Sequence, residues 1–203
     1  MFLKKMQLAG CLIVFQLMVI NVSSQNIDID ILKSINPQYP QSGYWKGVSK
    51  SYILVTGTAT IGELAYGLLA HDEKVQKNAC ETLIGIGINI VVTTGMKATF
   101  NRTRPSDKYP NDVFVLTTSN GHSFPSGHTS LAFATATSFA IQYKKWYVVV
   151  PAYLWAGSVG YSRMYLGKHY PTDVLAGAVV GTGSSLLSHW ISKKIFKPKK
   201  QRS

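Results

Sequence analysis

Five apolar segments, separated by charged connections of different lengths, most restrict how this chain can fold. They are rich in Gly, Ala, Ser and Thr, a composition typical of closely packed membrane helices. No alternation of apolar and polar residues is long enough to predict a sheet. We therefore predict an all-α fold, a bundle of about five or six helices that crosses a membrane repeatedly. The segments are Ser51–Ala70, Thr82–Met96, Thr129–Tyr143, Trp146–Tyr161 and Val174–Ile191.

The charge of the chain favours a membrane over nucleic acid. The formal net charge is +12 over 203 residues. The basic residues fall in short clusters between apolar runs and form no patch interleaved with aromatic residues, so we expect no nucleic-acid partner. None of the five segments is uniformly apolar, and a soluble, largely buried helical bundle therefore stays open as an alternative.

The two ends of the chain have compositions of their own. Residues 1–25 predict a signal peptide or N-terminal signal anchor, because Lys4 and Lys5 precede an apolar run from Leu8 to Ile20. That run is short for a transmembrane helix, which favours a cleaved signal. Residues 193–203 form a basic C-terminal tail.

Residues 26–50 predict an extracytoplasmic connecting segment. Pro37, Pro40 and Gly43 oppose a long helix there, although Ile27–Ile35 is compatible with a short one.

Lysines between the apolar segments predict the orientation in the membrane. If the N-terminal segment crosses outward and every later segment spans, these lysines share the inner side, in agreement with the positive-inside rule, although the outer loops carry basic residues too. The same alternation places residues 97–128 and 162–173 together on the outer face. The inner lysines are Lys74, Lys77, Lys144, Lys145 and those of the tail.

The stretch Gly121–His128 predicts a polar loop that leads into a helix. Ser126 is suited to cap that helix. Free backbone N–H groups and the helix dipole make such a start a natural anion site. Near it in the predicted topology lie Lys97, Arg104 and Arg163, which are suited to surround a phosphoryl group.

A histidine and a carboxylate stand four residues apart before the last apolar segment. Asp173 can hold one imidazole nitrogen of His169 protonated and direct the other at an electrophile, with Pro171 in the first helical turn. His128, from another helix start, can protonate a leaving oxygen. We expect His169 and His128 to face a wet pocket.

Together these clusters resemble the tripartite signature of the phosphatidic acid phosphatase type 2 and vanadium haloperoxidase superfamily. The signature is Lys97-x6-Arg104-Pro105, Pro125-Ser126-Gly127-His128 and Ser162-Arg163-x5-His169-x3-Asp173. The resemblance implies a catalytic domain over residues 51–192 that hydrolyses phosphate esters or diphosphates without a metal or other cofactor. It implies that His169 forms a phosphohistidine, that Asp173 orients it, and that His128 is the general acid. The implied phosphate-binding residues are Lys97, Arg104, Ser126, Gly127 and Arg163.

The predicted function is hydrolysis of a lipid phosphate or diphosphate in the cytoplasmic membrane of a bacterial-type envelope, with the active site facing the periplasm. The expected partners are the lipid substrate and the membrane, with no obligate protein partner. Three alternatives stay open: a soluble periplasmic acid phosphatase of the same superfamily, vanadate-dependent halide oxidation, and a non-catalytic membrane scaffold.

Several other residues have weaker interpretations. His122, His128 and His169 are poor candidates for a metal site because three cations nearby would repel the ion. Three further residues lie near the site but outside the signature: His122, Arg102 and Lys108. A role in substrate choice is a hypothesis that no motif supports. Glu63 stands inside an apolar segment, where an ionisable side chain is costly; a functional role competes with a contact to basic loops or solvent.

Overall fold

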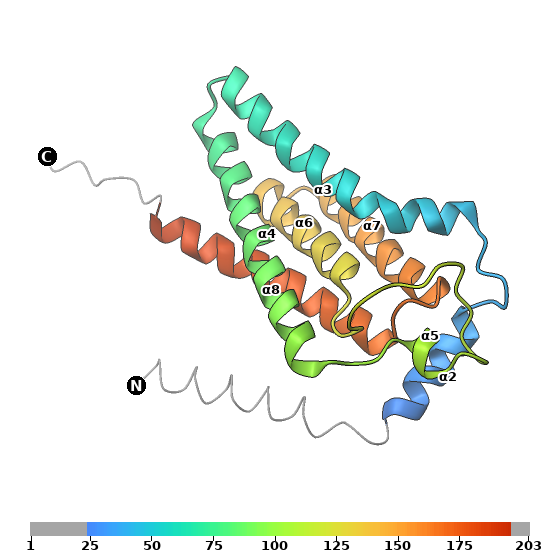
Figure 1. Ribbon diagram of the computed structural model, residues 1–203. Helices are drawn as coiled ribbons and strands as arrows, with labels where there is room; N and C mark the ends of the chain where they lie inside the picture. Colours follow the sequence, from blue (N-terminus) through green and yellow to red (C-terminus); the bar gives the residue numbers. More distant parts are fainter. Residues whose placement is uncertain (1–23, 196–203) are drawn as a thin grey trace, which may run out of the picture.

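The computed structural model describes residues 24–195, which form helices and loops and no strand (Figure 1). The predicted all-α bundle is confirmed. Residues 1–23 and 196–203, which hold most of the predicted targeting segment and basic tail, lie outside the described part. In chain order the helices are α2 (Ser24–Ile35), α3 (Gly43–Leu69), α4 (Glu73–Phe100), α5 (Pro105–Lys108), α6 (Gly127–Tyr143), α7 (Trp146–Tyr165) and α8 (Pro171–Ile195).

Two helices extend beyond the apolar segments that predicted them. α3 begins at Gly43, within the predicted connecting segment, because Ser42 accepts a hydrogen bond from the Trp45 amide at 3.4 Å. α4 begins at Glu73, where Asp72 accepts from the amide of Lys74 at 2.9 Å. Polar caps, rather than apolar runs, therefore set where these helices start. The short helix expected at Ile27–Ile35 is present as α2.

Small and polar side chains fill the interior of the bundle, whereas its surface is apolar. α6 packs against α3, α4, α7 and α8. Its Thr135 is hydrogen-bonded to Thr56 of α3 at 2.8 Å, and Ser138 donates to Ser185 of α8 at 3.1 Å. Large apolar side chains point outward instead. This inverted pattern suits a lipid environment, in which helices pack through small residues and interhelical hydrogen bonds.

Glycines set the distance between α6 and α8. A Cβ added to Gly181 would lie 2.0 Å from the Ser130 carbonyl oxygen, and one added to Gly177 would lie 2.6 Å from that of Ser126. The two helix backbones therefore touch only because these positions lack a side chain.

Three stretches of the described residues are long and apolar enough to cross a membrane: Gly43–Leu69, Glu73–Lys108 and Pro171–Ile195. They correspond to three of the five segments predicted to span. α6 has 17 residues, which gives about 26 Å at the rise of an α-helix. Together with the apolar surface, the three stretches make the chain a membrane protein.

Successive long helices run in opposite directions. The C-terminal ends of α4 and α7 and the N-terminal ends of α6 and α8 therefore lie together, beside α2 and α5 (Figure 1). The turns with Lys74 and Lys144 lie at the other end of the bundle. The fold thus gathers the loops that the topology predicted on one face.

Candidate active site

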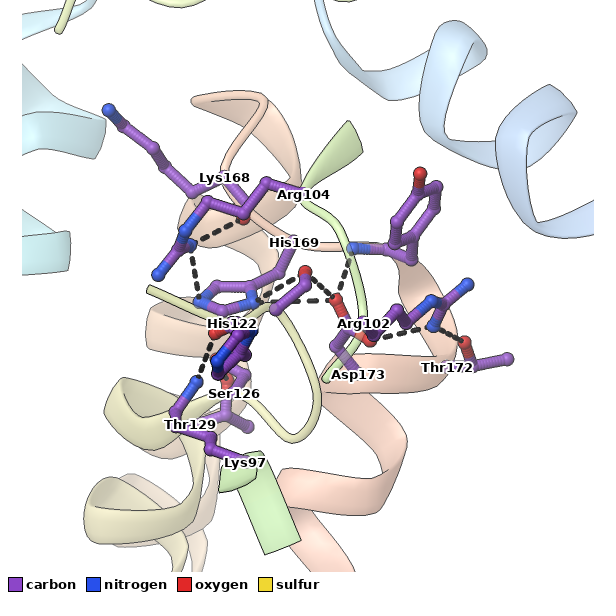
Figure 2. A network of polar contacts seen from close by, with 12 residues as sticks. Lys97, Arg102, Arg104, His122, Ser126, Thr129, Lys168, His169, Thr172 and Asp173 are labelled. Atoms are coloured by element: carbon purple, nitrogen blue, oxygen red, sulfur yellow. Dashed lines mark hydrogen bonds and ion pairs between the residues drawn. The ribbon is translucent and has the colours of Figure 1, made fainter. Parts of the chain in front are cut away.

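Loop hydrogen bonds bring the three signature motifs together at this end of the bundle (Figure 2). The amide of Ser126 donates to the Asp173 carbonyl at 2.9 Å, which joins the start of α6 to the start of α8. The amide of Ser123 donates to the Arg102 carbonyl at 2.8 Å, which joins the same loop to the end of α4. Residues distant in sequence therefore line one polar site.

His169 and Asp173 form a pair across the first turn of α8. His169 Nδ1 lies 3.4 Å from Asp173 Oδ2. The same oxygen accepts a hydrogen bond from the Tyr170 amide at 3.0 Å and another from Ser123 Oγ. Because Nδ1 faces the carboxylate, Nε2 is the ring nitrogen left for chemistry.

The exposure of His169 differs from the expectation of a wet pocket. Its side chain is only 2% exposed, because the loop with Ser123 and the start of α8 enclose it. Burial lowers the pKa of His169 to about 4, although Asp173 opposes the shift. The imidazole is therefore neutral near pH 7, as a nucleophilic nitrogen must be.

Arg104 connects His169 to the neighbouring loops. Its guanidinium donates to the carbonyls of Gly121 at 3.0 Å, Lys168 at 2.9 Å and Asn120 at 3.3 Å. Its NH1 also lies 3.5 Å from His169 Nε2. The free nitrogen of His169 and a fixed cation thus face each other, with backbone oxygens holding the cation in place.

The two other signature cations also have fixed positions. Lys97 Nζ donates to the His122 carbonyl at 2.6 Å. Arg163 NH1 donates to Ser49 Oγ of α3 at 2.7 Å, whereas its buried Nε has no hydrogen-bond partner among residues 24–195. Arg163 thus carries one buried donor that this part of the chain leaves unsatisfied.

Ser126 does not cap α6 in the predicted way. It occupies the N-cap position, but its side chain makes no capping hydrogen bond. Its buried hydroxyl instead accepts from Thr129 Oγ1 at 2.9 Å. At the neighbouring Gly127, an added Cβ would meet nothing closer than 3.9 Å. The start of α6 therefore keeps unoccupied amide groups and open space beside Gly127.

His128 lies in the first turn of α6 and stacks on Tyr52 of α3, with ring centroids 3.9 Å apart. Burial and the positive charges of Arg163, Arg104 and Lys97 lower the pKa of His128 to about 2. Without an anion in the site, this imidazole is neutral. It needs the charge of a bound phosphate before it can carry a proton.

A family comparison agrees with this arrangement. The sequence profile of the PAP2 superfamily matches residues 78–197. The chain belongs to the PAP2 superfamily. This confirms the resemblance inferred from the three motifs.

Individual relatives are similar over different shares of their length. A lipid A 1-phosphatase of Porphyromonas gingivalis is 32% identical over 71% of this chain and 30% of its own length. An undecaprenyl-diphosphatase of Sulfolobus acidocaldarius is 28% identical over 81% of this chain and 79% of its own. The chain spans between 30% and 41% of the length of the first three curated relatives it matches.

Two crystal structures share the fold. That of Aquifex aeolicus LpxE covers 81% of this chain and 95% of its own, with a TM-score of 0.65 and 26% identity. That of a transmembrane PAP2-type phosphatidylglycerolphosphate phosphatase from Bacillus subtilis covers 93% and 97%, with a TM-score of 0.71 and 24% identity.

Arg102 has contacts in this PAP2 site that the sequence analysis missed. Its guanidinium donates to Asp173 Oδ1 and to Asp28 Oδ2, each at 2.6 Å. The sequence could have indicated this role, because Arg102 stands between Lys97 and Arg104, in a stretch already assigned to the site. No sequence feature indicated a role for Asp28, because it belongs to a helix that is distant in sequence. Of the other two residues near the signature, His122 is exposed and Lys108 lies over the Tyr109 ring at 5.4 Å.

Glu63 lies away from this site, in the interior of the bundle. It is 7% exposed, and its Oε1 accepts from the Tyr143 hydroxyl at the end of α6, at 2.7 Å. The hydrogen bond from Tyr143 thus replaces the expected contact to basic loops or solvent, and a functional role for Glu63 stays a prediction. Within residues 24–195, no three His, Cys, Asp or Glu side chains are grouped so as to hold a metal ion.

Proposed function

We propose that this chain hydrolyses a lipid phosphate or diphosphate through a phosphohistidine formed on His169, without a metal ion. One observation carries the proposal. His169 Nε2 faces Arg104 at 3.5 Å, while Nδ1 faces the carboxylate of Asp173 at 3.4 Å. The imidazole is thereby oriented with its nucleophilic nitrogen toward a cationic seat for phosphate.

In the first step, His169 Nε2 attacks phosphorus. The N–P bond forms as the bond from phosphorus to the leaving oxygen breaks, and that oxygen takes a proton from His128. Asp173 stabilises the charge that develops on the imidazole through Nδ1–H. Lys97, Arg104 and Arg163, with Ser126 and the Gly127 amide, bind the phosphoryl oxygens, whose charge is dispersed in the transition state.

In the second step, water attacks the phosphohistidine. His128, now neutral, accepts a proton from the water, the N–P bond breaks, and inorganic phosphate leaves. The same residue therefore acts first as acid and then as base, and it returns to its starting protonation state.

The surface of the bundle supports a lipid substrate. Exposed apolar side chains cover the spanning helices, for example Leu54 at 65%, Val91 at 73% and Val179 at 72% exposure. The site lies at the ends of these helices, where a lipid headgroup would lie. Relatives named as lipid A phosphatases and undecaprenyl-diphosphatases favour the same substrate class.

The lysines at the opposite end of the bundle support an outward-facing site. Under the positive-inside rule, Lys74, Lys77, Lys144 and Lys145 lie in the cytoplasm, which orients His169 toward the periplasm of a bacterial-type envelope. A cysteine introduced at partly exposed Ser106 should react with an impermeant thiol reagent in intact cells, and one introduced at exposed Lys144 should not. The reverse labelling would contradict this orientation.

The direct test is phosphate release by purified protein in detergent with a chelator present. An isoprenyl diphosphate, a phospholipid phosphate and a soluble aryl phosphate are compared side by side. We expect chelator-resistant turnover that favours a lipid and is lost in His169→Ala but kept in His71→Asn. His71 is a matched control because it is exposed at the far turn, where its positive φ of 51° suits asparagine.

Other outcomes would select the alternatives. Turnover of the aryl ester alone, with release of active protein by osmotic shock, would identify a soluble acid phosphatase. No turnover of any substrate would leave a non-catalytic scaffold.

A further inference from the structure

We propose that Asp28 of α2, acting through Arg102, is a positioning residue that fixes the orientation of Asp173 and hence of His169. This inference rests on the proposed role of His169. It assigns a catalytic contribution to α2, a helix that precedes the residues matched by the PAP2 profile, 78–197.

Asp28 is anchored to the first turn of α8. Its Oδ1 accepts a hydrogen bond from the Thr172 amide at 2.9 Å, and its Oδ2 accepts from Thr172 Oγ1 at 2.6 Å. Its side chain is almost fully buried, at 2% exposure. A carboxylate from α2 thus satisfies a free amide at the start of α8, on the residue directly before Asp173, and adds negative charge at the positive end of that helix.

Arg102 lies between the two carboxylates. Its NH2 donates to Asp28 Oδ2 and its NH1 donates to Asp173 Oδ1, each at 2.6 Å. NH1 also donates to Thr172 Oγ1 at 2.7 Å, and the guanidinium lies over the Tyr170 ring at 3.9 Å from its centroid. Figure 2 shows the contacts of Arg102 with Asp173 and Thr172. Together, the contacts of the guanidinium fix both its direction and its plane.

The consequence for Asp173 is that its two oxygens have different tasks. Oδ1 is occupied by Arg102, so the carboxylate turns Oδ2 toward Ser123, the Tyr170 amide and His169 Nδ1. Removing the Asp28 charge would free one arm of Arg102 and loosen this arrangement without touching the phosphate seat.

α2 is rigid enough for this role because its other end is also anchored. Asn36 Nδ2 donates to the carbonyls of Phe114 at 3.0 Å and Tyr165 at 2.8 Å, and Asn36 Oδ1 accepts from the Phe114 amide at 2.7 Å. Between the two anchors, the fully buried Leu32 packs in a cluster with Val113 and Tyr170. The position of Asp28 is therefore defined by the rest of the molecule.

Steady-state kinetics of Asp28→Asn, measured on the best lipid substrate, test the inference. Outer contacts that orient active-site groups typically contribute factors of about 10 to 100. We expect kcat to fall about tenfold or more, with KM nearly unchanged because the phosphate-binding residues are untouched. Asp30→Asn is the matched control, since Asp30 is exposed on the same helix, and it should retain wild-type kcat.

Arg102→Lys provides the second variant, because lysine keeps the charge but lacks the fork. We expect a similar loss of kcat, and no further loss in the double variant, since the two residues act as one unit. Wild-type kcat in Asp28→Asn, equal losses in Asp28→Asn and Asp30→Asn, or additive losses in the double variant would overturn the inference while leaving the proposed function intact. An inactive wild-type protein would overturn the proposed function and this inference with it.

Discussion

The two nitrogens of His169 occupy different environments, one facing a carboxylate and the other a guanidinium. We expect His169→Ala to lower kcat by about a thousandfold or more, because no other side chain replaces the nucleophile. Asp173→Asn should lower kcat less, since it removes the orientation and the charge stabilisation of His169 but keeps its nucleophilic Nε2. Single-turnover rates on the preferred lipid compare the two variants, and equal losses would point to a more direct role for Asp173.

His128 predicts a coupling between anion binding and protonation. With the site free of anions, its pKa of about 2 lies far below the ordinary 6.5, because burial and the positive charges of Arg163, Arg104 and Lys97 disfavour the protonated ring. A bound phosphate or vanadate supplies opposing negative charge and raises that pKa, so binding near neutral pH should take up a proton. Calorimetry in buffers of different ionisation enthalpy measures the uptake. His128→Ala should abolish the part of the proton uptake that is due to this imidazole. Identical heats in all buffers for the wild type would contradict the assignment of His128 as the group that takes up the proton.

The signature residues could be located from the sequence because each motif is local, and their roles stay predictions. The contacts that orient them could not be inferred in the same way. Ser123 and Asp173, or Asp28 and Arg102, meet only after distant segments pack together. The burial of His169 was missed for the same reason, since the loop that covers it comes from another part of the chain.

At the scale of helices, the apolar segments and their composition predicted which parts of the chain become helical, whereas polar caps decided where the helices start. The start of α3 at Gly43 depends on Ser42, and that of α4 at Glu73 depends on Asp72. Neither cap is part of an apolar run. The sequence analysis therefore identified α3 and α4 but placed both starts too late.

The contact between α6 and α8 predicts a difference between two glycines of one helix. Gly181→Ala would place a methyl group against the Ser130 carbonyl oxygen, forcing the helices apart, whereas at Gly183 an added Cβ meets nothing within 4 Å. We expect Gly181→Ala to destabilise the fold by about 1–3 kcal/mol or more. Gly183→Ala should be neutral or slightly stabilising, because alanine favours a helix. Thermal unfolding in detergent tests this, and equal midpoints would contradict the close approach.

For the whole molecule, antiparallel helices collect the signature at one end, and Lys74, Lys77, Lys144 and Lys145 at the other. The sequence predicted this arrangement because the order of spans alone fixes which loops share a face. The depth of the site relative to the lipid headgroups depends on helix tilt and packing, which the order of spans does not specify.

The central claim is a covalent phosphoryl intermediate on His169, and trapping that intermediate tests it most directly. The protein is mixed with a lipid carrying a radiolabelled terminal phosphate, denatured rapidly under alkaline conditions, and digested for peptide mapping. We predict label on the peptide containing His169, stable to alkali and labile to acid, that is lost in His169→Ala and kept in His71→Asn. Turnover without such label at any quench time, or label that persists in His169→Ala, would contradict the account.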